Sequence, residues 1–146
     1  MEAIPKLKLV MKRLEKALLI GEKNGTKRHL LVDENGIPLS LSITAGNKHD
    51  ITQMYNLIDI RKLGYKGSIL VDKGYKSKAL HKKIKQDFDI EIVMANNGKR
   101  WIVEVYHSWF NNFRKLKVRY EKATSSFLGL HCLAASLIVF RRVIVI

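Results

Sequence analysis

Cysteine, proline and acidic residues are scarce in this chain of 146 residues. The single cysteine, Cys132, excludes a disulfide framework and a cysteine zinc site, and it favours a reducing, cytoplasmic environment. Only 13 acidic residues stand against 27 lysines and arginines, so the formal net charge is +14. Such an excess raises self-repulsion in the compact state, and the common reason to carry it is a polyanionic partner. We therefore expect nucleic acid first and an anionic membrane surface second.

The chain also lacks a long uninterrupted hydrophobic run. Lysines interrupt the N-terminal segment, which argues against a signal peptide. The longest apolar stretch, Leu128 to Phe140, is broken by His131 and is shorter than the roughly 20 residues that a membrane-spanning helix needs. It is interpreted as a buried helix, with a membrane-surface contact through the following Arg141 and Arg142 as the alternative. Because 47% of the residues are hydrophobic, the composition predicts one folded domain.

The segment GEKNG at residues 21–25 is the one candidate joint in the chain. Before it, apolar residues recur at spacings of three and four, which predicts an amphipathic helical segment over residues 1–20. These residues are Leu7, Val10, Met11, Leu14, Ala17 and Leu18. Residues 21–146 are predicted to form the domain proper.

After the joint, the pattern predicts alternating strands and helices. Two apolar runs flank Asp33-Glu34-Asn35-Gly36, and Asn-Gly suits a tight turn, so we expect a β-hairpin whose second strand has one buried and one polar face. Helices are predicted over residues 51–63, 77–86, 101–117 and 125–143, the first capped by Asp50 and the second by Ser77. Strands are predicted over residues 68–72 and 90–95. This order predicts a mixed α/β sheet with helices packed on it.

Two acids have surroundings that suit a catalytic site. Asp72 ends a buried strand, where open α/β sheets place ligand-binding residues, and its oxygens suit a hard cation such as magnesium. Capping of the next turn explains its position equally well. Glu104 lies among large apolar residues, four positions after Arg100. A pair with Arg100 is the simpler reading, but a buried acid needs either a partner or a metal.

Basic residues follow both acids, which suits phosphodiester binding beside a metal-bound centre. For any single lysine, a solvated helix face explains the charge better. The first cluster contains Lys73, Lys76, Lys78, Lys82, Lys83 and Lys85, and the second contains Arg114, Lys115, Lys117, Arg119 and Lys122. Aromatic residues around the second cluster favour nucleic acid. The five histidines lack metal-ligand spacing, and His49 is interpreted as orienting a backbone or phosphate group.

Four linked motifs resemble the DDE transposases of bacterial insertion sequences, in the branch with an RNase-H-like catalytic core. The motifs are GTKRHLLVDENGIPLSLSITAGNKHD, VDKGYKS, RWIVEVYHSWFNNFRKLKVRYEK and FLGLHCLAASLIVFRR. The resemblance implies an RNase-H-like mixed sheet with flanking helices. It also implies that Asp72 and Glu104 are the second and third acids of a catalytic triad, and that Arg100 belongs to the motif around the third acid.

In that family the triad holds two Mg²⁺ or Mn²⁺ ions that promote phosphodiester cleavage and strand transfer. The partners implied are the DNA of element ends and target, and a transposase oligomer, with no membrane. DNA contacts are expected from Lys73, Lys76, Arg114, Lys115, Lys117 and Arg119.

The first acid of the triad has no counterpart in this sequence. It should lie on a strand before the hairpin, but the acids there, Glu2, Glu15 and Glu22, are not on a strand-like run, and Asp33 is explained by turn chemistry. We therefore expect the C-terminal part of a transposase without its first central strand, in which the first 20 residues replace that strand. Such a chain should bind DNA but be catalytically impaired. The alternatives are a non-catalytic DNA-binding regulator or inhibitor of a full-length transposase, and a decayed remnant.

Overall fold

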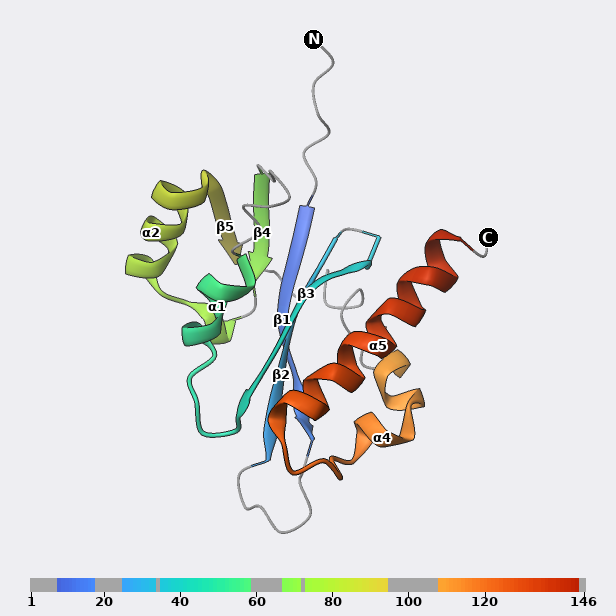
Figure 1. Ribbon diagram of the computed structural model, residues 1–146. Helices are drawn as coiled ribbons and strands as arrows, with labels where there is room; N and C mark the ends of the chain where they lie inside the picture. The colour runs from blue at the N-terminus through green and yellow to red at the C-terminus, as the bar shows by residue number, and fades with distance from the viewer. Residues whose placement is uncertain are drawn as a thin grey trace.

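The computed structural model describes residues 8–17, 25–33, 35–58, 67–71, 73–94 and 108–144. These residues form a five-stranded sheet with helices on both faces (Figure 1). The strands are β1 (Lys8–Ala17), β2 (Thr26–Val32), β3 (Pro38–Ala45), β4 (Gly67–Val71) and β5 (Ile90–Met94). The helices are α1 (Ile51–Ile58), the short 3₁₀ helix η2 (Lys73–Tyr75), α2 (Lys78–Phe88), α4 (Arg114–Lys117) and α5 (Thr124–Val143).

The strand order across the sheet is β3-β2-β1-β4-β5. Strand β1 is antiparallel to β2 and parallel to β4, and β4 is parallel to β5. Strands β2 and β3 form the antiparallel hairpin that Asn-Gly predicted, with the backbone N–H of Gly36 donating to the carbonyl of Asp33 at 3.0 Å. The predicted mixed α/β sheet is therefore confirmed.

The prediction of an N-terminal amphipathic helix was wrong. Residues 8–17 form β1, which lies in the middle of the sheet, so the described sheet has a central strand where its absence was expected. The first residues do take the place of a central strand, as a strand rather than as a helix. The spacing of apolar residues suits a helix, but a segment between β2 and β4 gains ladder hydrogen bonds on both sides, and such tertiary pairing overrides local propensity.

The hydrophobic core is divided between the two faces of the sheet. All seven residues of β2 are buried. Leu31 packs with α1, η2 and α2, whereas Leu30 and Val32 pack with α5 and its neighbours. Side chains alternate between the faces of a strand, so each face of β2 contributes to a separate cluster. Helices α1 and α2 therefore cover one face, and α4 and α5 cover the other.

Several predicted element boundaries are confirmed. Helix α1 begins directly after Asp50, and α2 begins after Ser77, whose hydroxyl accepts a hydrogen bond from the backbone N–H of Leu80 at 3.3 Å. The single helix predicted over residues 101–117 is interrupted. Residues 108–112 are helical, but Phe113 is extended at φ −85° and ψ 102°, and α4 begins after it. Residues 101–107 lie outside the described residues.

The predicted polar face of the hairpin is only partly correct. Leu41 and Ile43 of β3 pack on the α5 side, as expected. However, the opposite face is covered rather than solvated, since Thr44 is buried and its hydroxyl contacts His29. Strand β3 thus has helices on both of its faces.

Helix α5 is buried along one side only, which corrects the expectation of a buried helix. Phe127, His131, Ala134 and Ile138 face the core, while Leu133 is 60% exposed. The helix is apolar around most of its circumference, so packing one side on the sheet leaves apolar side chains on the other. By length and composition α5 also meets the criteria for a membrane span, a test that core helices pass as well.

Candidate functional site

The carboxyl end of β4 is where the sequence places Asp72. Parallel pairing sets Met11 of β1 opposite Val71, the last residue of β4, and sets Val71 opposite Met94 of β5. Asp72, Arg100 and Glu104 lie outside the described residues, so the predicted acids and their arginine are not placed. The structure describes the ends of the parallel strands and the η2 turn that follows β4.

Strand β1 brings no carboxylate to this end of β4. Its residues from Lys8 to Leu14 contain no acid, and Lys12 follows the residue that pairs with Val71. Glu15 is the acid of β1, but it is four residues beyond Met11, about 13 Å along an extended strand. Within the described ranges, no three of His, Cys, Asp and Glu gather in a metal-binding group.

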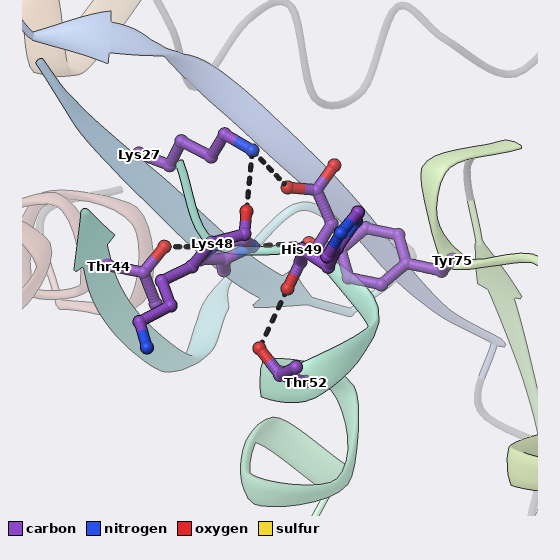
Figure 2. A network of polar contacts seen from close by, with 8 residues as sticks. Lys27, Thr44, Lys48, His49, Thr52 and Tyr75 are labelled. Carbon is purple, nitrogen blue, oxygen red and sulfur yellow. Dashed lines mark hydrogen bonds and ion pairs between the residues drawn. The ribbon is translucent and has the colours of Figure 1, made fainter. Parts of the chain in front are cut away.

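The η2 turn is anchored to the sheet through Asp50. A Cβ atom on Gly74 would lie 2.8 Å from Oδ2 of Asp50, so the turn approaches this carboxylate closely. Asp50 is 7% exposed, and its Oδ1 lies 3.1 Å from the Nζ of Lys27 on β2. The same Nζ donates to the carbonyl oxygen of Lys48 at 2.7 Å (Figure 2). This buried ion pair joins β2 to the loop before α1, and the turn after β4 packs closely against it.

A second polar link joins the turn to β2 through His29. The His29 ring is fully buried, with Nδ1 2.7 Å from the hydroxyl of Tyr75 and Nε2 2.9 Å from Oγ1 of Thr44. The carbonyl of Tyr75 also accepts a hydrogen bond from Nε2 of His81 on α2, at 2.9 Å. Both ring nitrogens of His29 thus have hydrogen-bond partners, as burial of polar atoms requires. These bonds fix the backbone that leaves the end of β4.

This network was not predicted from the sequence. Lys27, His29 and Tyr75 were not singled out, because a basic triplet at the start of a short strand reads as a solvent-exposed end. The sequence does hold one indication of their burial. The residues Lys27-Arg28-His29 run directly into the apolar residues Leu30-Leu31-Val32 of the same strand. His49, which was expected to orient a backbone or phosphate group, is exposed, and its carbonyl accepts a hydrogen bond from the Thr52 hydroxyl at 2.7 Å (Figure 2).

The predicted DNA-contacting residues lie on two opposite faces. Lys73 and Lys76 are exposed on the η2 turn and directly after it, next to the end of β4. Arg114, Lys115 and Lys117 are exposed on α4, which packs against α5 on the other side of the sheet (Figure 1). The structure therefore does not bring the two clusters together in one patch.

Arg119 differs from the other predicted contacts because it is 5% exposed. Its guanidinium donates to the carbonyls of Glu121 and Lys122, both at 2.8 Å. It also donates to the hydroxyls of Thr26 at 2.7 Å and Thr124 at 3.2 Å. These bonds hold the chain before α5 against β2. We therefore leave Arg119 out of the candidate DNA-binding surface.

The architecture matches the catalytic cores of retroviral integrases, which have an RNase-H-like fold. The HTLV-2 integrase catalytic core domain in complex with magnesium (trimeric form) has a TM-score of 0.57 and 12% identity, covering 94% of this chain and 85% of that chain. An integrase-containing structure, the simian T-cell lymphotropic virus intasome in complex with PP2A regulatory subunit B56 gamma, has a TM-score of 0.61 and 14% identity, covering 94% of this chain and 48% of that one. These likenesses confirm the predicted fold class.

The chain belongs to the transposase DDE domain family, whose model matches residues 21–139. A putative transposase for insertion sequence element IS402 from Burkholderia cepacia is 36% identical over 131 residues, covering 74% of this chain. The chain spans 61% of the length of that relative. The resemblance to insertion-sequence transposases is thereby confirmed.

Proposed function

We propose that this chain acts in DNA transposition by binding element-end DNA, with an incomplete acidic triad that leaves it catalytically impaired by itself. The observation that carries the proposal is the composition of β1. This strand pairs with β4 up to Val71, directly before Asp72, yet it has a lysine and an arginine, Lys12 and Arg13, after the residue opposite Val71. Membership of the transposase family suggests metal-dependent phosphodiester cleavage. The missing carboxylate on β1 is expected to reduce this activity.

Asp72 and Glu104 are proposed as the two acids of the site, with Arg100 as a supporting residue. In this family, divalent metal ions activate the attacking oxygen and stabilise the leaving oxygen. The HTLV-2 integrase core is described in complex with magnesium, which supports Mg²⁺ as the ion for this fold. Two carboxylates do not supply all the ligands of a two-metal site. We therefore expect this chain to bind metal ions weakly.

DNA binding is proposed at the exposed basic residues near the site. Lys73 and Lys76 flank the η2 turn, which the His29–Tyr75 hydrogen bond holds in place. Lysines in fixed positions beside the end of β4 suit phosphate contacts that position a duplex over the site. Arg114, Lys115 and Lys117 on the opposite face suit a second DNA segment, such as target DNA.

The test is magnesium-dependent nicking of a duplex that carries the cognate element end. We expect no cleavage above background from the 146-residue chain, and unchanged DNA binding by Asp72→Ala and Glu104→Ala variants. Lys12→Asp tests the missing acid directly, since it adds a carboxylate to β1. Cleavage by the unmodified chain that disappears in Asp72→Ala would refute the impairment while supporting the site. Loss of DNA binding in the same variant would contradict the separation of the two roles.

The alternative function is regulation, in which the chain occupies element ends or assembles with a complete transposase and inhibits it. The observation that favours this alternative is that exposed basic residues lie on η2 and on α4, where they suit DNA contacts that need no cleavage chemistry. HTLV-2 integrase cores occur in dimeric and trimeric forms, which makes co-assembly a reasonable route. Inhibition of a full-length transposase by this chain, undiminished by Asp72→Ala, would distinguish the regulator from an impaired enzyme.

A further inference from the structure

A groove runs between α5 and the segment that contains α4. A cavity of about 560 Å³ is lined in part by Trp109, Phe113 and Leu137, and a neighbouring cavity of about 220 Å³ shares Phe113 and Leu137. The larger volume lies within the range of about 300–1,000 Å³ that is typical of binding pockets. The two cavities share Phe113 and Leu137 in their walls, and we call the surface that they form together the α4–α5 groove.

Exposed apolar residues of α5 extend the α4–α5 groove along the helix. Leu133, Leu137, Phe140 and Ile144 are 60%, 42%, 50% and 67% exposed. Their spacing of four, three and four residues places them on one side of a helix. Contiguous apolar surface rimmed by charge usually marks an interaction site. This stripe is such a surface, and it is separate from the end of β4.

The rim of the groove is positively charged. Arg141 and Arg142 line the larger cavity, and Arg114 and Lys115 line the smaller one. The guanidinium of Arg142 lies 4.4 Å from the centre of the Trp109 ring, which holds this cation at the rim. Among the described residues that line the two cavities, none is acidic. An occupant must therefore combine apolar side chains for the floor with negative charge for the rim.

We propose that the α4–α5 groove binds an acidic amphipathic helix of a partner protein. Helix-in-groove recognition uses apolar anchors at i, i+3, i+4 and i+7, and flanking acids would pair with Arg141 and Arg142. A second copy of this chain would bring a net charge of +14 to a basic rim. Duplex DNA presents phosphates on its outside and keeps its bases stacked inside, so it offers few apolar groups to a floor built from Phe113 and Leu137. A membrane surface would contact the outer stripe of α5 rather than the space between two helices.

This inference goes beyond the proposed function, and its test does not depend on DNA cleavage. The probe is a fluorescein-labelled synthetic helix of about four turns, with leucines at the anchor positions and glutamates on both flanks. Fluorescence anisotropy with the full 146-residue chain measures its affinity. Two control peptides replace the glutamates by lysines or the leucines by serines. We expect the acidic peptide to bind at least about tenfold more tightly than either control.

Variants of the chain locate the peptide. Leu133→Glu places a charge on the apolar wall at an exposed position, and Arg141→Glu/Arg142→Glu reverses the rim. Each is expected to weaken peptide binding by about tenfold or more. Lys78→Glu/Lys82→Glu changes the same charge on α2, on the opposite face, and should leave the affinity within about twofold. Circular dichroism and a cooperative thermal transition verify that each variant is folded.

Three results would overturn the proposal. The first is equal binding of the acidic and basic peptides, or no binding of either. The second is an equal loss of affinity in the α2 control, which would indicate a general charge effect. The third is occupation by something else: Leu133-dependent self-association in light scattering, or Leu133-dependent flotation with phosphatidylserine vesicles, in the absence of peptide binding.

Discussion

Three consecutive basic side chains, Lys27, Arg28 and His29, are buried in the middle of β2. Burial of a charge or a polar group is costly unless a partner replaces water. On one face, Lys27 and His29 meet Asp50 and Tyr75; on the other, Arg28 lies 3.5 Å from Nε2 of His131. The partners come from distant parts of the chain, so these residues join the sheet to its two layers of helices.

The Tyr75–His29 hydrogen bond should contribute measurably to stability. Tyr75→Phe removes the hydroxyl and leaves a buried imidazole nitrogen without that partner, which is expected to cost about 1–3 kcal/mol. Tyr55→Phe is the matched control, because its hydroxyl donates to Asp87 at 2.7 Å in an exposed setting and its loss should cost less than about 1 kcal/mol. Urea denaturation of both variants measures the difference. Equal losses in the free energy of unfolding would show that the buried hydrogen bond contributes no more to stability than the exposed one.

His131 should make stability depend on pH. Burial lowers its pKa from 6.5 to about 4, although the hydrogen bond to the Phe127 carbonyl acts in the opposite direction; nearby Arg28 lowers the pKa further. The folded protein therefore keeps His131 neutral at pH 5, while the unfolded chain binds a proton there. Since the unfolded state binds more protons, stability falls as pH decreases from about 6.5 towards 4. Between pH 7 and pH 5 this effect amounts to about 2 kcal/mol.

Denaturation of the unmodified chain and of His131→Gln at several pH values measures this effect. The variant removes the titrating group while keeping a polar side chain, so its stability should change less between pH 7 and pH 5. Its absolute stability is expected to be lower, and only the difference in pH dependence counts. Parallel curves for the two proteins would assign the pH dependence to other groups.

At the scale of elements, most helices and strands could be predicted from sequence, because each has a local signal. Ser77 caps α2, Asn35-Gly36 forms the hairpin turn, and β4 and β5 are short apolar runs. Strand β1 could not be predicted, since its leucines, lysines and methionine are good helix formers at helical spacing. Only its place between β2 and β4 makes it a strand. The interruption of the helix at Phe113 could not be predicted either, because no proline or glycine stands there.

The candidate site was only partly predictable for the same physical reason. The buried strand that ends at Val71, directly before Asp72 in the sequence, could be predicted because it is a short apolar run. The anchoring of the next turn depends on Asp50 and His29, which approach it only in the folded chain. Likewise, the burial of Arg119 depends on Thr26, 93 positions away in the sequence. Local patterns carry no information on such pairings.

The η2 turn should tolerate no side chain at position 74. In Gly74→Ala, the new Cβ would lie 2.8 Å from Oδ2 of Asp50, and that carboxylate is held by Lys27 in a buried ion pair. Displacing it is expected to cost about 1–3 kcal/mol. Gly129→Ala is the matched control: it lies in α5 with nothing within 4 Å, and should stabilise by about 0.5–1 kcal/mol. Thermal unfolding of the two variants should shift in opposite directions, and a shift in the same direction would contradict this account.

At the scale of the whole molecule, the sheet separates two groups of exposed cations. Lys73 and Lys76 lie between the end of β4 and the start of α2. Arg114 and Lys115 lie on α4, on the other side of the sheet. A net charge of +14 attracts DNA from any direction, but contact residues on opposite faces suit two DNA segments rather than one.

Salt dependence of DNA binding can separate the two groups. Each phosphate contact contributes about −0.9 to the slope of log affinity against log salt, so Lys73→Ala/Lys76→Ala should reduce the slope by about 2. Arg114→Ala/Lys115→Ala should reduce the slope by a similar amount where the duplex occupies the second face. Lys85→Ala is the control, since Lys85 pairs with Asp89 at 2.9 Å on α2 and is expected to leave the slope almost unchanged. Filter binding of a short duplex at several salt concentrations measures all four slopes. An unchanged slope in both double variants would remove these residues from the DNA-binding surface, while an effect in only one would assign binding to a single face.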